Sequence, residues 1–226
     1  MPTRPLIVAT GNPGKLREFR ALLSDLPFEL HGLGELGIAG PEESGATFLE
    51  NAMLKARHAA AAAQALRFRG AAPAGVVAIA DDSGLEVDAL GGAPGIFSAR
   101  YAGAGADDAA NNAKLVSALA GTPPERRGAR YRCALVLVFM PSDAAPDGAV
   151  PENAAPLSAA PLIAEGVWEG CILDSPRGSG GFGYDPYFWL PELGLTAAEL
   201  DPAEKNRLSH RGIAMRALRD QLLARP

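Results

Sequence analysis

The sequence is poor in cysteine and histidine and has no long hydrophobic run. Each of these shortages argues against one class of protein. It holds two cysteines, Cys133 and Cys171, and three histidines, at positions 31, 58 and 210. Both cysteines lie in apolar runs, so we expect buried free thiols and no disulfide framework. The histidines lack zinc-site spacing. No apolar stretch approaches the roughly 18 residues of a membrane span, and the first is too short for a signal peptide. We expect a cytoplasmic protein without membrane contact.

An excess of basic charge is also missing. The formal net charge is −5, so the chain lacks the positive field typical of nucleic-acid binders, and we expect no stable nucleic-acid partner. A polyanionic ligand must therefore be held by local cations or by a metal ion. The length of 226 residues and the hydrophobic fraction of 48% predict one globular domain, residues 1–226, with a substantial core.

Strand-like and helix-like segments alternate along the chain. Apolar runs predict strands, and apolar residues at helical spacing predict helices that begin at capping residues. The expected strands are Leu6–Ala9, Val76–Ala80, Arg130–Phe139 and Leu162–Leu173; the expected helices begin at Pro13, Thr47, Asp107, Pro202 and after Ser209. Because the last two strands form a hairpin, we predict an α/β fold with a mixed sheet. Residues 67–75 and the Pro- and Ala-rich segment 141–161 are expected to be surface loops.

The loop Thr10–Lys15, sequence TGNPGK, joins the first strand to the first helix. Backbone N–H groups at a helix N-terminus attract anions, and Lys15 adds a positive charge, so the loop could hold phosphate. It is not a Walker A motif, which would need Gly at position 9 and Ser or Thr at position 16, where this chain has Ala9 and Leu16. An ordinary strand-to-helix turn with a surface lysine explains the loop as well.

Three acidic residues are candidates for chemistry. Asp81 and Asp82 are expected to follow a buried strand, where ligands bind in open α/β sheets. Carboxylates there can hold Mg²⁺, or one can act as a general base on water. Turn capping is the competing interpretation. Glu50 stands three residues after Thr47, the spacing of a capping box, so its local pattern favours a cap.

A second glycine-rich loop, GSGGFGYDP, spans residues 178–186. It contains G-x-G-x-x-G, but Pro186 and the aromatic residues that follow argue against a helix there, so we reject a dinucleotide site. An aromatic ring in such a loop suits stacking on a flat base, although a hydrophobic plug is an alternative. Further on, Lys205, His210 and Arg211 form a cationic cluster that could contact phosphates or base carbonyls, or could be solvated helix ends.

Together and in this order, five motifs resemble the inosine/xanthosine triphosphate pyrophosphatase family over nearly the whole chain. They are ATGNPGK at 9–15, FLENAMLKA at 48–56, ADDSGLEVDALGGAPG at 80–95, GFGYDP at 181–186 and K-N-R-x-S-H-R at 205–211. The long hairpin loop 141–161 departs from the family's compact form and touches none of the motifs.

The resemblance implies an elongated, two-lobed α/β fold around a mixed twisted sheet, with helices on its faces and a substrate cleft between the lobes. It also implies a homodimer, a Mg²⁺ requirement, and release of pyrophosphate from ITP, dITP and XTP, which clears these purine nucleotides from the pool. Matched by position, the phosphate-binding residues are Thr10, Gly11, Asn12, Pro13, Gly14 and Lys15; the metal ligands are Glu50 and Asp82, with Asp82 also the proton acceptor; Ser83 contacts substrate; Phe182, Gly183, Tyr184 and Asp185 surround the base; and Lys205, His210 and Arg211 complete the pocket. For Glu50, the resemblance favours the metal over the cap.

Three other functions remain open from the residues. A kinase or phosphate-releasing NTPase could be built on the first loop. A nucleotide-binding protein without turnover would need the same loops, and a related pyrophosphatase could act on modified pyrimidine nucleotides.

Overall fold

The computed structural model describes residues 4–65, 77–139 and 160–224, and the strands in these ranges are hydrogen-bonded in a seven-stranded order. The strand order is β2-β1-β3-β4-β5-β6-β7. The strands are β1 (Arg4–Val8), β2 (Phe28–Gly32), β3 (Val77–Val87), β4 (Gly128–Phe139), β5 (Leu162–Ile172), β6 (Phe188–Leu190) and β7 (Leu195–Thr196). The α-helices are α1 (Pro13–Leu22), α2 (Phe48–Ala65), α3 (Asp108–Ala118), α4 (Pro202–Leu208) and α5 (His210–Leu223).

The chain divides into two compact units, each built from separate stretches of sequence. The first unit comprises residues 1–82, 134–164 and 215–226, and the second comprises residues 83–133 and 165–214. Strands β3, β4 and β5 and helix α5 begin in one unit and end in the other.

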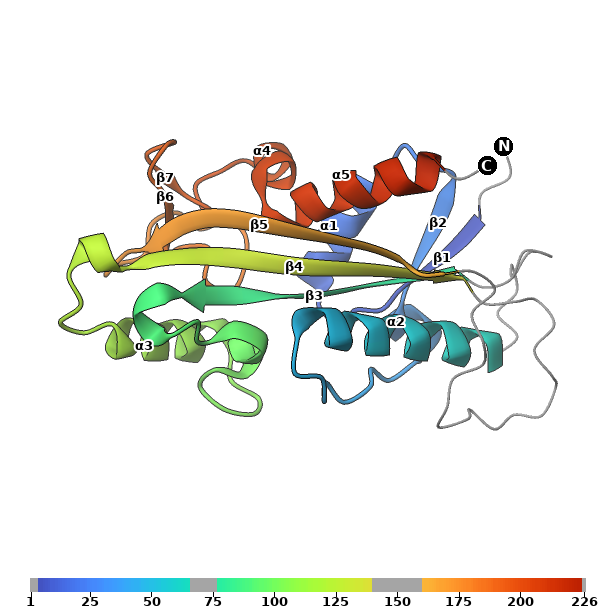
Figure 1. The fold of residues 1–226 in the computed structure, drawn as a ribbon, viewed down its shortest axis with the longest axis horizontal. Coiled ribbons are helices and arrows are strands. Elements are labelled where there is room, and N and C mark those ends of the chain that lie inside the picture. Colours follow the sequence, from blue (N-terminus) through green and yellow to red (C-terminus); the bar gives the residue numbers. More distant parts are fainter. Residues whose placement is uncertain (1–3, 66–76, 140–159, 225–226) are drawn as a thin grey trace. The chain divides into compact units, whose positions relative to one another are not determined.

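The first unit is a parallel sheet covered by helices. Strand β1 pairs in parallel with β2 and with β3, so Leu6 lies opposite both Leu30 and Val77. Leu6, Ile7 and Val8 are fully buried, as parallel strands with two covered faces require. Helices α1 and α2 lie on opposite faces of this sheet (Figure 1), which is where right-handed crossovers place them.

The second unit contains antiparallel strand pairs. Strand β5 pairs with β6, and β6 pairs with β7, both antiparallel. Its core contains Tyr131, Trp168 and Phe188, with ring centroids of Tyr131 and Phe188 4.6 Å apart. Helix α5 packs directly on β5, because a Cβ added to Gly166 would stand 2.0 Å from the His210 carbonyl oxygen.

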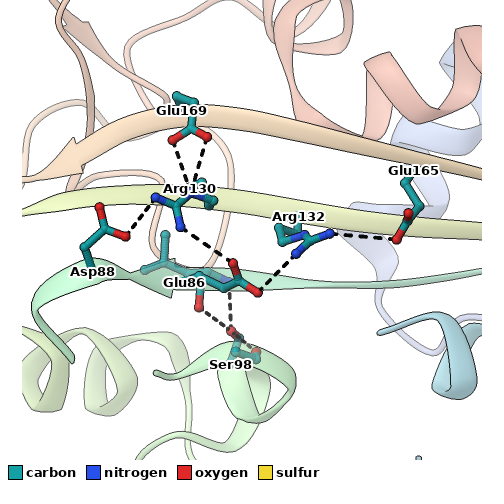
Figure 2. A network of polar contacts seen from close by, with 9 residues as sticks. Glu86, Asp88, Ser98, Arg130, Arg132, Glu165 and Glu169 are labelled. Atoms are coloured by element: carbon teal, nitrogen blue, oxygen red, sulfur yellow. Dashed lines mark hydrogen bonds and ion pairs between the residues drawn. The ribbon is translucent and has the colours of Figure 1, made fainter. Parts of the chain in front are cut away.

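Charged side chains cross the strands of the second unit in the network of Figure 2. Arg130 on β4 contacts Asp88 at 2.8 Å and Glu169 on β5 at 3.3 Å. Arg132, two residues along β4, reaches Glu86 on β3 at 3.8 Å. Arg132 also reaches Glu165 on β5 at 4.0 Å, so it stands between acidic residues of the two strands that flank β4.

The structure confirms the predicted α/β class, the mixed sheet and the free thiols of Cys133 and Cys171. The strand predicted to end before Asp81 is the main error, because β3 continues through the acidic pair to Val87. Strands β2, β6 and β7 were not predicted; β6 and β7 are only three and two residues long. The predicted loop 67–75 and residues 141–159 of the other predicted loop lie outside the described residues. None of the helices in the described ranges is long and apolar enough to cross a membrane.

Candidate functional site

The first predicted loop forms the turn between β1 and α1. The side-chain oxygen of Asn12 accepts hydrogen bonds from the N–H groups of Gly14 at 2.8 Å and Lys15 at 3.2 Å. Thr10 supports Asn12 by accepting its N–H at 3.1 Å. The predicted helix cap is confirmed, and it leaves Lys15 as the positive charge of this turn. The Lys15 ammonium group lies 3.0 Å from Asp81.

Asp82 sits next to Asp81 in β3 and is held by helix α2. The Nζ atom of Lys55 lies 2.6 Å from Asp82 Oδ1, and the Asn51 side chain donates to Asp82 Oδ2 at 3.3 Å. Lys55 also contacts Glu43 at 3.0 Å. Asn51 and Lys55 are four residues apart, so both project from the same face of α2 onto Asp82.

Lys55 and Asn51 were not among the candidate residues predicted from the sequence. Both lie in the motif FLENAMLKA, where only Glu50 was singled out. The available signal was a polar pair at helical spacing on a segment otherwise dominated by apolar residues. Both are buried in the structure, and buried polar side chains require partners such as Asp82.

Burial and charge shift the pKa values of this pair. Burial raises the pKa of Asp82 and outweighs the opposing effect of the Lys55 ammonium group. For Lys55, burial acts to lower the pKa, but the carboxylates of Asp81, Asp82 and Glu43 together raise it. Lys55 therefore stays protonated, while Asp82 becomes a stronger proton acceptor than an ordinary aspartate. This is the property that a general base needs.

Glu50 lies at the exposed start of α2 and makes a cap-like pair of hydrogen bonds. Its N–H donates to Thr47 Oγ1 at 3.1 Å, as the capping box predicts. Its carboxylate accepts from the N–H of Ala46 at 2.7 Å, one residue before the position that a standard box would use. In this state Glu50 caps the helix, and its exposure leaves the carboxylate accessible to an ion.

The carboxylates of Glu50 and Asp82 fit a Mg²⁺ ion that is bound together with a ligand. Within the described ranges, no three His, Cys, Asp or Glu side chains gather to hold a metal by themselves. Mg²⁺ commonly uses one or two carboxylates, with water and substrate phosphate completing its shell. Glu50 and Asp82 supply hard oxygen atoms of this kind. Asn51, which follows Glu50 in α2, contacts Asp82, so the start of this helix lies close to that carboxylate.

In the second unit, Asp185 organises the predicted base-binding loop. It is 3% exposed and accepts hydrogen bonds from the Phe182 N–H at 2.8 Å and from Lys205 Nζ at 2.6 Å. The hydroxyl group of Tyr131 donates to its other oxygen at 3.4 Å. Lys205 also lies 4.7 Å from the centre of the Phe182 ring. Asp185 thus ties the loop to helix α4 and leaves the Phe182 ring partly exposed.

Tyr184, unlike Phe182, belongs to the hydrophobic core of the second unit. Its hydroxyl group donates to the Ser98 carbonyl at 2.7 Å, and its ring is almost fully buried. Burial raises the pKa of Tyr184, so the phenol remains a neutral donor. Of the two aromatic residues predicted to surround a base, Phe182 is the one whose ring is accessible for stacking.

The cationic residues near helix α5 are buried, so their interpretation as solvated helix ends is wrong. Lys205, His210 and Arg211 are 7%, 5% and 2% exposed. The His210 ring stacks on Tyr131 at 4.7 Å between centroids. Arg211 Nη2 donates to Ser83 Oγ at 2.9 Å. Buried ionic side chains need partners, and contacts with protein groups such as Asp185 and Ser83 hold Lys205 and Arg211 in place.

The predicted residues therefore form two clusters, one in each unit. The first unit holds Thr10 to Lys15, Glu50 and Asp82; the second holds Ser83, Phe182 to Asp185, Lys205, His210 and Arg211. Asp82 and Ser83 are consecutive residues of β3, so one strand carries members of both clusters.

A sequence model of the Ham1 family matches residues 6–221. A dITP/XTP pyrophosphatase of Xanthomonas campestris is 51% identical over 219 residues, 97% of each chain. One from Methylococcus capsulatus is 51% identical over 221 residues, 98% of this chain and 97% of its own.

Solved structures agree with the sequence matches. A HAM1 protein from Coxiella burnetii superimposes with a TM-score of 0.77 at 41% identity, covering 99% of this chain and 100% of its own. The Staphylococcus aureus Ham1 protein has a TM-score of 0.73 at 35% identity, with 97% and 98% covered. The resemblance inferred from the five motifs is thereby confirmed, and the chain belongs to the Ham1 family.

Proposed function

We propose that this protein hydrolyses non-standard purine nucleoside triphosphates (ITP, dITP and XTP) to the monophosphate and pyrophosphate. The observation that carries the proposal is the buried carboxylate of Asp82, held by Lys55 in the same unit as the Lys15 turn. The names of the full-length relatives from Xanthomonas and Methylococcus support the substrate class.

The first unit's cluster is assigned to the phosphates. Lys15 and Lys55 supply positive charge, and Glu50 and Asp82 are the proposed Mg²⁺ ligands. When bound, Mg²⁺ offsets negative charge on the phosphate oxygens. Enzymes that cleave phosphate anhydrides accelerate the reaction mainly by positioning the reactants and by stabilising developing charge. Lys15, whose ammonium group contacts Asp81, is the proposed phosphate contact of the first turn.

Asp82 is the proposed proton acceptor. It takes a proton from a water molecule whose oxygen forms the new bond to the α-phosphorus. The bond between the α-phosphorus and the bridging oxygen breaks, and pyrophosphate leaves with that oxygen. The water thus supplies the oxygen and one proton of the nucleoside monophosphate, and the proton on Asp82 is returned to solvent. Lys55 orients the carboxylate through its 2.6 Å contact.

The second unit's cluster is assigned to the base. Phe182 offers a ring for stacking, and Arg211 offers a donor to the 6-oxo group of hypoxanthine or xanthine. Adenine carries an amino group there, which would leave the donor unpaired at a cost of roughly 2–4 kcal/mol. Ser83 accepts from Arg211, so it can hold the guanidinium group in place and contact the substrate.

We further propose that residues 1–226 act as one catalytic domain, in a cytoplasmic homodimer. The two free cysteines suit a reducing compartment, and the dimer follows from the family resemblance. Light scattering of the purified chain tests the dimer directly, and a monomer at micromolar concentration contradicts it.

Product analysis tests the function. Purified protein is incubated with ITP, dITP, XTP, GTP, ATP and dUTP, with and without Mg²⁺, and the released phosphate species are separated. We expect pyrophosphate from the first three only, and only with Mg²⁺. Release of orthophosphate would indicate a phosphatase instead, preference for dUTP a pyrimidine enzyme, and tight binding without turnover a non-catalytic protein.

A further inference from the structure

Helix α3 holds both backbone polar groups of Gly183, the residue after Phe182. The Gly183 N–H donates to the carboxylate of Asp108 at 2.6 Å. The Gly183 carbonyl accepts from the side-chain amide of Asn112 at 2.9 Å. Asp108 and Asn112 are four residues apart and so lie on one face of the helix. Two side chains of α3 therefore clamp one residue of a loop more than 70 positions away in sequence.

Gly183 needs such a clamp because of its conformation. Its φ angle is +62°, in the left-handed region where glycine is favoured. Glycine also has the largest backbone freedom of any residue, so the residue at position 183 does not by itself fix the direction in which Phe182 projects. Asp185 fixes the Phe182 N–H on one side, and the α3 clamp fixes the residue on the other side of the Phe182 carbonyl.

The neighbouring residues of α3 show that the clamp is not a by-product of helix capping. Asp107 is the N-cap, and its side chain accepts from the Ala110 N–H at 2.8 Å. Asp108 is thereby released from the capping task, and its carboxylate points to Gly183. Asn111 is committed elsewhere, since it holds Ala99 and Ala102.

Asn112 is a polar side chain placed where the helix could have carried an apolar one. It is 8% exposed, and within the described residues its Oδ1 atom is buried with no hydrogen-bond partner. The nitrogen of the same amide donates a hydrogen bond to the Gly183 carbonyl oxygen. A buried amide with an unsatisfied oxygen destabilises the fold. The contact with Gly183 is therefore the evident benefit of having asparagine at this position.

We infer that Asp108 and Asn112 are positioning residues that set the Phe182 ring for stacking on the purine. This inference rests on the proposed function, in which Phe182 contacts the base. The clamp acts on affinity for the base and on discrimination between bases. It does not act on the phosphates or on the proton transfer at Asp82.

Hydrogen exchange tests the clamp without reference to any activity. In the intact protein, exchange of the peptide that contains the Gly183 amide is compared among wild type, Asp108→Ala and Asp107→Ala. We expect Asp108→Ala to speed exchange at residues 183–184 about tenfold or more, because the charge-assisted hydrogen bond is lost. The matched control Asp107→Ala removes the helix cap and should leave that amide protected. Unchanged protection in Asp108→Ala, or equal loss in both variants, overturns the clamp.

Kinetics then test its role. With ITP, Asp108→Ala and Asn112→Leu should raise KM roughly five- to twentyfold, the loss expected for one or two hydrogen bonds, while kcat stays within about twofold. Competitive inhibition by inorganic tripolyphosphate, which has no base, should be unchanged. Asn112→Leu should keep or raise the melting temperature, since it removes a buried unsatisfied oxygen, so a rise in KM there is not a folding defect.

The two failures are distinguishable. A wild-type KM for ITP in both variants, or an equal loss of tripolyphosphate affinity, sinks the positioning role while the proposed function stands. If wild-type protein releases pyrophosphate from no nucleotide, the proposed function fails, and the exchange experiment still decides whether the clamp exists.

Discussion

The ammonium group of Lys55 lies 2.6 Å from Asp82 Oδ1, and both side chains are buried. The pair joins helix α2 to the middle of β3. It also controls the acid strength of the proposed general base, because Lys55 is the largest influence that opposes the effect of burial on Asp82.

Replacing Lys55 with methionine should therefore move the pH profile. Without the ammonium group, the pKa of Asp82 rises further, so the carboxylate is protonated over a wider range. The acidic limb of the kcat profile should shift to higher pH, and kcat at neutral pH should fall roughly 10- to 1,000-fold. Lys55→Arg, which keeps the charge, is the matched control and should leave the limb near its wild-type position. An unshifted limb in Lys55→Met contradicts the assignment of Asp82 as base.

Asp82→Asn should greatly lower kcat while the protein stays folded. Asparagine keeps the size and can still accept a hydrogen bond from Lys55, but it cannot take a proton. We expect kcat to fall about 10²–10⁴-fold, the usual contribution of a general base. Circular dichroism and thermal unfolding check the fold. Asp88→Asn, an exposed aspartate of the Figure 2 network, is the control and should retain activity. Near-normal turnover in Asp82→Asn would exclude this residue as the base.

The surface network itself should matter little for stability. Arg130 is about one-third exposed, and its partners Asp88 and Glu169 are more exposed still. Exposed ion pairs contribute roughly 0–1 kcal/mol each and are screened by salt. Arg130→Gln should lower the free energy of unfolding by less than about 1 kcal/mol, and the difference should shrink in 1 M NaCl. A larger, salt-independent loss in urea denaturation would show that Arg130 does more than pair charges.

The sequence predicted the elements whose signals are local. The cap at Asn12, the helix start at Thr47 and the capping role of Ser209 each depend on residues within one turn, and each is present. Strands β6 and β7 could not be predicted, because two or three residues carry no periodicity. The end of β3 was misplaced because aspartate usually terminates strands; here Lys15 and Lys55 pair with the two carboxylates and allow the strand to continue.

The sequence proposed candidate residues for the site but not their contacts. Motif order put forward Asp82, Phe182 and Arg211, and only the fold shows that Lys55 contacts Asp82 or that Tyr184 is buried in the core.

Arg211 should control the choice of base. It is 2% exposed and donates a hydrogen bond to Ser83, so its guanidinium group is held in one position. A base is recognised there only if it places an acceptor at that position. Arg211→Lys keeps the charge but loses the planar fork, and it should reduce the preference for ITP over ATP in kcat/KM by about tenfold or more. Ser83→Ala, which removes one acceptor of the guanidinium group, should give a smaller effect in the same direction. An ITP-to-ATP ratio equal to that of wild type in Arg211→Lys and in Arg211→Ala would remove Arg211 as the base reader.

Gly166 should tolerate no side chain, for a reason independent of function. Its Cα faces the first turn of α5, and a Cβ would stand 2.0 Å from the His210 carbonyl oxygen and 2.8 Å from the Ala214 nitrogen. Both are backbone atoms, so the helix as a whole would have to move away from β5. Gly166→Ala should cost about 1–3 kcal/mol or more of stability, as overpacked cores do, and lower the melting temperature by roughly 2–4 °C per kcal/mol. Gly34→Ala is the matched control, because a Cβ there meets nothing within 4 Å. If thermal unfolding shifts equally in the two variants, the close approach of α5 to β5 is not what requires glycine at position 166.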